Sequence, residues 1–233
     1  MPHVLDSPAP LSARARAFLT AHARLRPVGA GPGDDECRAA MRSAIGHSDE
    51  HALATFRRIQ RRYSGLTYLS PFRRSEIVFE PVFEADPEAG RVVFPYAIMD
   101  TAPDGCRSGF VLPDEAVWFG LLDVDAPVFA SLDHFLECDA LLHHARRRRP
   151  VSTVTPPDAA AHLMALRDRH PLLRPIGAAS GYCVAWWGDE ERLVYVDGLD
   201  ARLAADGRGA SPVPVVVTTW LLGEPAPRPR SLT

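Results

Sequence analysis

The first third of the chain shows the spacing of apolar positions that is typical of amphipathic helices. Between residues 49 and 63 the apolar side chains recur three and four positions apart, as expected for one helix face: Ala52, Leu53, Phe56, Ile59 and Tyr63. The same criterion predicts helices over residues 12–25 and 35–45, separated by a Gly/Pro-rich stretch at residues 27–35. We therefore expect three helices before the first strand.

From about residue 76 the period changes from that of a helix to that of a strand. Short turn-rich stretches separate four predicted strands: residues 76–83, 91–99, 108–112 and 116–122. Such short connections are typical of an antiparallel meander, with mixed pairing as the alternative. A closing helix begins at Ser131, and its last turn is rich in arginine. The order of elements predicts an α+β fold with N-terminal helices and a central sheet.

The C-terminal part of the chain has a pattern of its own. Residues 150–157, PVSTVTPP, are typical of a linker, and a helix is predicted over residues 158–170. Three strand-like runs follow: residues 182–187, 192–197 and 213–222. We expect a domain over residues 1–149, a linker, a helix-and-strand extension over residues 158–224, and a mobile tail over residues 225–233. The extension is either a small subdomain or a continuation of the first sheet.

Composition narrows the class of protein. Among the 233 residues, 46% are hydrophobic and 24% are charged, as in soluble globular proteins. No apolar run approaches the roughly 20 residues that span a bilayer, and the first residues lack the basic and apolar blocks of a secretory signal. The four cysteines are far apart, which disfavours a disulfide framework or a zinc knuckle. We expect a cytoplasmic protein that does not act at membranes.

Charge is distributed unevenly along the chain. Residues 76–139 hold 14 acidic residues and only two arginines, whereas both flanking segments are net basic. The acidic segment is either neutralised within the molecule or forms a surface for a basic partner. The second interpretation predicts partner-binding residues on an exposed rim of the sheet: Glu80, Glu84, Asp114, Glu115, Asp123 and Asp125. Trp186 and Trp187 alternate faces on a predicted strand, so at least one of them is a candidate interface anchor.

Two stretches suggest catalytic chemistry, and each also has a simpler explanation. His47-x-x-Glu50-His51 has the spelling of an inverted zinc-protease motif, which requires one continuous helix. Gly46 is expected to end the preceding helix and Ser48 to cap a new one, so we predict no metal site here. Cys138 lies five residues before His143, which on a helix separates the two side chains, and we expect a packed thiol. We predict no catalytic residues and no cofactor.

Arginine clusters suggest a third possibility. The polar face of the helix over residues 49–63 carries Arg57, Arg58, Arg61 and Arg62, and Arg146–Arg149 end the closing helix. A basic helix face can bind nucleic acid, but stacking aromatic residues do not interleave with these arginines. All 26 basic residues are arginine, which is typical of GC-rich coding and discounts such clusters. We expect the arginines of the helix to face solvent.

With the order of elements established, residues 49–142 resemble the SUKH superfamily, which includes many bacterial immunity proteins. The resemblance lies in four stretches: FRRIQRRYSGLTYL, IVFEP, RSGFVLPDEAVWFGLLD and FASLDHFLECDALL. Ser64-Gly65 occupies the place of the family's Gly-Gly or Asn-Gly corner, and Ser131–Leu136 that of its final SxxxFL helix. Ser64 departs from the corner pattern, and residues 150–233 are an addition to the segment that resembles the family.

The resemblance implies a non-enzymatic α+β protein that neutralises a co-encoded toxin by protein–protein contact. The acidic segment suits a basic partner such as a nuclease-type toxin, because complementary charge speeds association. Two alternatives stay open at this point: a hydrolase that depends on a metal or a thiol, and a nucleic-acid-binding or regulatory protein that uses the arginine-rich helix.

Overall fold

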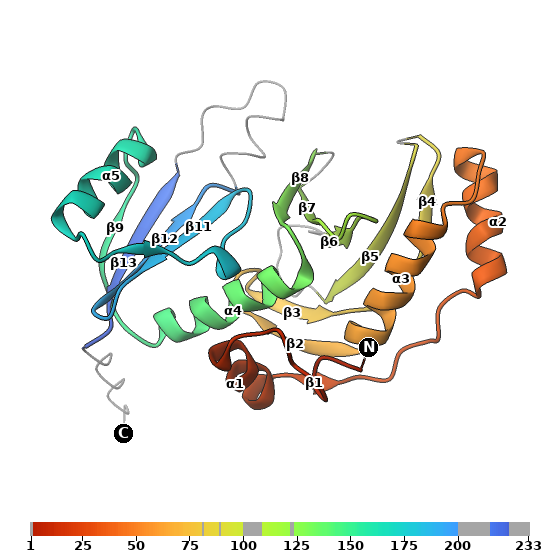
Figure 1. Cartoon of the computed structure of the whole chain (residues 1–233), viewed down its shortest axis with the longest axis horizontal. Helices are drawn as coiled ribbons and strands as arrows, with labels where there is room; N and C mark the ends of the chain where they lie inside the picture. Colours follow the sequence, from red (N-terminus) through yellow and green to blue (C-terminus); the bar gives the residue numbers. More distant parts are fainter. Residues whose placement is uncertain are drawn as a thin grey trace.

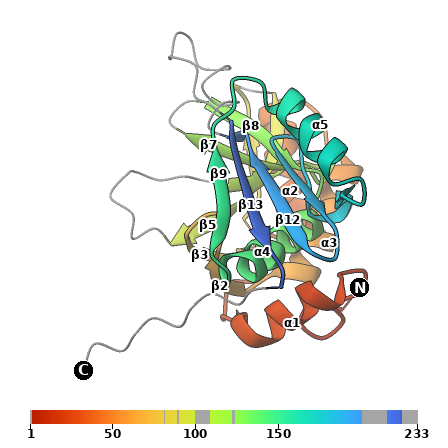
Figure 2. The same ribbon diagram turned by 90° about the vertical axis from the view of Figure 1, so that its left-hand side faces the viewer.

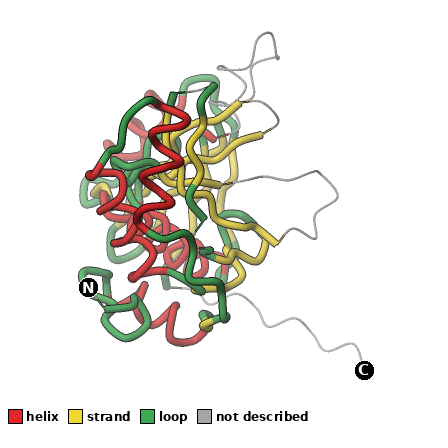
Figure 3. Tube along the Cα trace, turned by 90° about the vertical axis from the view of Figure 1, so that its right-hand side faces the viewer, coloured by secondary structure: helices red, strands yellow, loops and turns green. Residues whose placement is uncertain are grey.

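The computed structural model describes residues 2–80, 82–88, 90–99, 109–121, 124–199 and 215–223. Within these residues the chain forms five α-helices, a short 3-10 helix and two antiparallel sheets (Figure 1). The predicted α+β class is therefore confirmed. Figure 3 shows helices and strands largely gathered on opposite sides of the molecule. Among the described residues, the helices are too short or too polar to cross a membrane.

The three N-terminal helices are α1 (Ala13–His22), α2 (Asp34–Ile45) and α3 (Glu50–Tyr63). Gly46 ends α2 in the left-handed conformation, with φ of 82°, as the sequence predicts. The residue that caps α3 is Asp49 rather than the expected Ser48, and its carboxylate accepts hydrogen bonds from the backbone N–H groups of His51 and Ala52. The helix predicted over residues 12–25 is shorter, because the chain turns into a two-residue strand, β1 (Arg24–Leu25).

The first sheet contains eight strands within the described residues. They are β1, β2 (Leu66–Ser70), β3 (Ser75–Val78), β4 (Glu84–Asp86), β5 (Arg91–Met99), β6 (Gly109–Val111), β7 (Val117–Leu121) and β8 (Val124–Phe129). The order is β1-β2-β3-β5-β6-β7-β8, and β4 pairs with the start of β5. Helix α3 packs on this sheet through Phe56, whose ring centroid lies 5.3 Å from those of Phe83 and Phe94.

The predicted strands are right for the centre of this sheet and incomplete at its margins. Strand β5 has the predicted bounds, Arg91–Met99. The single strand predicted over residues 76–83 is wrong in extent, because β3 ends at Val78 and β4 begins only at Glu84. The sequence pattern does not predict strands β2 and β8.

Helix α4 (Leu132–Arg146) lies between the two sheets and joins their cores (Figure 1). On one side, Phe135 packs against Phe119 and Phe129 of the first sheet. On the other side, the Nε1 of Trp186 in the second sheet donates a hydrogen bond to the Sγ of Cys138, 3.4 Å away. One hydrophobic core therefore runs from α3 through α4 to the second sheet.

The second sheet contains five strands within the described residues, in the order β10-β11-β12-β13-β9. They are β9 (Pro150–Val154), β10 (Arg174–Pro175), β11 (Val184–Gly188), β12 (Arg192–Asp197) and β13 (Val216–Leu221). Helix α5 (Ala159–Arg169) precedes β10, and the 3-10 helix η1 (Gly177–Ala179) lies between β10 and β11.

Residues 150–154, predicted as part of a linker, are strand β9 of the second sheet. Among the described strands it lies at the sheet edge and pairs with β13 alone, and Figure 2 shows the two side by side. Its side chains are largely exposed, so the polar, Pro-containing sequence resembles that of a linker. The C-terminal part is thus a separate sheet and does not continue the first one.

Candidate functional site

Most of the described acidic side chains in the central segment are engaged within the molecule. Glu115 forms an ion pair with Arg58 of α3 at 2.8 Å, and Asp125 forms one with Arg91 at 3.1 Å. Further ion pairs join Glu76 to Arg24, Asp86 to Arg91, and Asp133 to Arg62. Three of these partners, Arg24, Arg58 and Arg62, come from the basic N-terminal segment. The uneven charge of the sequence is therefore balanced in part by contacts between distant segments.

Two further acidic residues are buried. Asp139 is fully buried, and its carboxyl accepts hydrogen bonds from the Tyr68 hydroxyl, the Ser70 hydroxyl and the Phe72 N–H. Burial raises the pKa of Asp139 to about 7. Glu137 on the same helix accepts hydrogen bonds from the backbone and hydroxyl of Ser12 before α1. Both residues fasten α4 to neighbouring elements and are not available to a partner.

Part of the predicted acidic rim stays exposed. Glu84 on β4 and Asp114 in the β6–β7 turn are exposed, and so is Glu88 in the β4–β5 turn. Strand pairing places them at one end of the sheet, next to the start of β5. Glu84 lies opposite Val93 of β5, and the end of β6 at Val111 lies opposite Phe94. Asp123 lies outside the described residues. We call Glu84, Glu88 and Asp114 the acidic end of the sheet.

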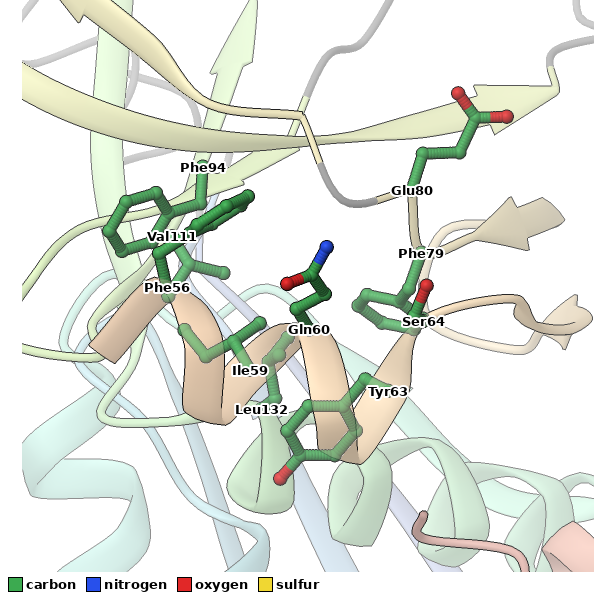
Figure 4. Close-up of a pocket in the computed structure, with 10 residues that line it drawn as sticks. All are labelled: Phe56, Ile59, Gln60, Tyr63, Ser64, Phe79, Glu80, Phe94, Val111 and Leu132. Carbon is green, nitrogen blue, oxygen red and sulfur yellow. The ribbon is translucent and has the colours of Figure 1, made fainter. Parts of the chain in front are cut away.

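Glu80, the remaining member of the predicted rim, lines a small cavity between α3 and the sheet (Figure 4). Figure 4 shows its carboxylate directed away from the apolar lining, which includes Phe56, Tyr63 and Phe79. The cavity volume is about 20 Å³, which accommodates little more than one water molecule. This cavity is a packing gap beneath α3 and does not offer a ligand site.

The two tryptophans proposed as interface anchors differ in their surroundings. Trp186 is fully buried, where its ring stacks 5.9 Å from that of Trp220, so its assignment as a partner-binding residue is wrong. Trp187 is partly buried on the opposite face, and the guanidinium carbon of Arg167 lies 5.0 Å from its ring centroid. The alternation of a strand correctly separates the two rings, but α4 covers the face that carries Trp186.

The residues considered for thiol chemistry do not converge. Cys138 is fully buried against Trp186, and burial raises the pKa of its thiol well above the ordinary value. His143 points toward α1, where its ring centroid lies 4.3 Å from that of His22. A buried protonated thiol without a neighbouring base is a poor nucleophile.

The stretch that resembles a zinc motif has the local geometry expected from its sequence. His47 lies between α2 and α3, and its Nδ1 is 3.1 Å from the Ile45 carbonyl oxygen. His51 lies in the first turn of α3, after the break at Gly46. Glu50 forms an ion pair with Arg38 of α2 at 2.8 Å. The three side chains therefore do not share the continuous helix that the motif requires.

The arginines of α3 are not the solvated face that the sequence predicts. Arg62 is 4% exposed, and its guanidinium contacts Tyr63 and Asp133. Arg57 pairs with Asp34 at 2.6 Å, and Arg58 pairs with Glu115. Arg61, the fourth arginine of this helix face, is exposed. The expectation holds for Arg61 and is wrong for Arg62, which neighbouring elements bury, while Arg57 and Arg58 are partly covered and paired with acids. A paired arginine contributes little to binding nucleic acid.

In the comparisons with known proteins, no family model, curated protein or solved structure matches the chain.

Proposed function

We propose that this protein is a non-enzymatic binding protein of the immunity type, which neutralises a basic protein partner by non-covalent contact. The resemblance of residues 49–142 to the SUKH superfamily supports the class. The proposal includes action in the cytoplasm on a co-encoded, nuclease-type toxin. The observation that carries it is the acidic end of the sheet, where three exposed carboxylates form no ion pair within the described residues, whereas Glu115 and Asp125 do.

The ion pairs narrow the proposed contact surface. Arg58 and Arg91 already neutralise Glu115 and Asp125, so these acids add little to the attraction of a basic partner. Glu84 on β4, Glu88 in the β4–β5 turn and Asp114 in the β6–β7 turn are exposed at the same end of the sheet. Clustered charge of one sign steers a partner of opposite sign during diffusional encounter. We therefore assign the partner contact to the acidic end of the sheet.

The experiment measures association with the product of the adjacent gene, as a function of salt. A variant with Glu84→Lys and Asp114→Lys should associate at least about tenfold more slowly at low ionic strength, because electrostatic steering is lost. The difference should narrow near 0.15 M salt, where exposed charges are screened within about 8 Å.

The matched control carries Asp168→Lys and Glu190→Lys, two exposed acids of the C-terminal part. This control changes the net charge by the same amount but leaves the acidic end intact, so its association rate should stay close to that of the parent. Equal slowing of both double variants would show that only net charge matters. Unchanged rates in the first variant would contradict the assigned surface.

A further inference from the structure

A cavity of about 440 Å³ lies between the C-terminal end of α4 and the second sheet. Three arginines line it: Arg74 from the β2–β3 turn, Arg146 at the end of α4, and Arg148 two residues after that helix. The opposite wall carries polar groups of β9, β12 and β13: Thr153, Tyr195, Asp197 and Thr218. A second cavity of about 470 Å³ shares Arg74 and Arg146 with the first. We call the 440 Å³ cavity the arginine pocket.

The β2–β3 turn brings two of these arginines together, and Figure 1 shows the turn close to α4. Arg146 donates a hydrogen bond from Nη1 to the carbonyl oxygen of Pro71 in this turn. Arg74 occupies the left-handed backbone region with φ of 58°, where residues other than glycine are uncommon. The backbone N–H of Arg74 donates to the Ser70 carbonyl oxygen at 2.8 Å, which holds this conformation.

The positive charges of the pocket are not balanced by ion pairs within the described residues. Partial desolvation of the Arg146 guanidinium, and then the charge of Arg74, lower the pKa of Arg146. Arg148 is held by carbonyl groups, because its Nη1 donates to the His144 oxygen at 3.0 Å and its Nε to the Leu222 oxygen at 3.3 Å. Like charges gathered around a cavity favour an anion that relieves their repulsion.

A buried hydroxyl gives a second, independent indication of a ligand. The Tyr195 hydroxyl is buried and meets no acceptor in good hydrogen-bond geometry within the described residues. Burial, and after it the nearby Cys138 and Asp197, raise the pKa of Tyr195, and Asp197 is the nearest acceptor for its hydroxyl. A buried polar group without a partner costs free energy, and a ligand oxygen in the cavity would satisfy it.

We propose that the arginine pocket binds a small phosphate-bearing molecule, with its phosphate between the guanidinium groups of Arg74 and Arg146. Guanidinium groups match phosphate oxygens in charge and geometry. The hydroxyls of Tyr195, Thr153 and Thr218 then face the remainder of the ligand. The position of the cavity between the β2–β3 turn, the end of α4 and the second sheet favours a small molecule over a nucleic-acid backbone. This site is remote in sequence from the acidic end of the sheet and does not depend on the proposed function.

The test is titration calorimetry of the full chain with pyrophosphate and with inorganic phosphate, at constant ionic strength. The parent protein should bind pyrophosphate saturably and melt at a higher temperature in its presence than in sodium chloride of equal ionic strength. Arg74→Gln should raise the Kd for pyrophosphate by about tenfold or more, the effect of losing one charge-assisted hydrogen bond. Arg74 is exposed in a turn, so this variant is expected to fold.

The matched control is Arg61→Gln, which removes an exposed arginine of α3 outside the pocket and should leave the Kd unchanged. Tyr195→Phe removes only the hydroxyl and should weaken binding without loss of the fold. Equal Kd values for Arg74→Gln and the parent would overturn the proposal, and so would a melting shift no larger than that in sodium chloride. Tighter binding of a short single-stranded DNA than of pyrophosphate would overturn the assignment to a small ligand.

Discussion

The guanidinium of Arg62, in the last turn of α3, lies 3.3 Å from the carboxylate of Asp133, in the first turn of α4. The same carboxylate accepts a hydrogen bond from the Tyr63 hydroxyl at 2.7 Å. Arg62 also donates to the Ala9 carbonyl oxygen at 2.9 Å, so it connects the N-terminal segment, α3 and α4. Arg62 therefore has a structural role, because its contacts hold three segments together.

Replacement of Arg62 by alanine should therefore destabilise the protein. We expect a loss of roughly 3 kcal/mol in the free energy of unfolding, because the partner carboxylate and the surrounding polar groups lose a buried donor. Arg61→Ala on the same helix is the control and should change stability by less than about 0.5 kcal/mol, as is usual for an exposed site. Urea unfolding of both variants measures the difference; equal midpoints would contradict the structural role of Arg62.

Phe56 and Arg58 provide a second comparison on α3. Phe56 is 1% exposed and contacts the rings of Phe83 and Phe94, so Phe56→Ala should cost roughly 3–5 kcal/mol of unfolding free energy. Arg58→Ala removes a half-exposed ion pair with Glu115, which is worth about 0.2–1 kcal/mol. Melting temperatures of Phe56→Ala and Arg58→Ala measure the difference. Equal, small effects would show that α3 does not pack on the sheet through Phe56.

Asp139 should make stability depend on pH. Its folded-state pKa of about 7 lies above the ordinary value of 3.8, so between these values the folded protein keeps a proton that the unfolded chain releases. Stability should therefore fall as pH rises from about 4 to 7, by up to roughly 4 kcal/mol relative to a variant without the carboxyl. Asp139→Asn keeps a neutral polar group of similar shape, so its unfolding free energy should lack the decrease between about pH 4 and 7 that Asp139 causes. Chemical unfolding at several pH values tests this prediction. If the unfolding free energies of the parent and the variant changed in parallel with pH, a raised pKa of Asp139 would be excluded.

Cys138 should resist thiol reagents in the folded protein. It is fully buried beside Trp186, and burial keeps its thiol protonated by raising its pKa. Incubation with iodoacetamide near neutral pH, followed by peptide mapping, should leave Cys138 unmodified until denaturant is added. Rapid modification of Cys138 in the native protein would instead revive the hypothesis of a thiol-dependent enzyme. Cys37, which is also buried and has a raised pKa, serves as an internal comparison.

The local pattern of apolar and polar residues predicts the helices and strands that carry a clear run or stripe of apolar side chains. Helix α3 has a strong apolar stripe and begins after Gly46, and β5 and β12 have the predicted bounds, because β-branched and aromatic residues follow one another there. The pattern misses strand β9 because an exposed edge strand carries proline and small polar residues, as a linker does. It misses strand β8 because Asp125 and Pro127 interrupt the apolar run.

The amino-acid sequence by itself determined the α+β class, the helix break at Gly46 and the concentration of acidic residues between positions 76 and 139. Only the tertiary structure decided which charges remain for a partner, because ion pairs such as Arg62–Asp133 join residues 71 positions apart. It also decided that Trp186 is buried and that Arg74 and Arg146 share a cavity. Burial and charge pairing depend on which elements pack together, and the periodicity of each element alone does not contain this information.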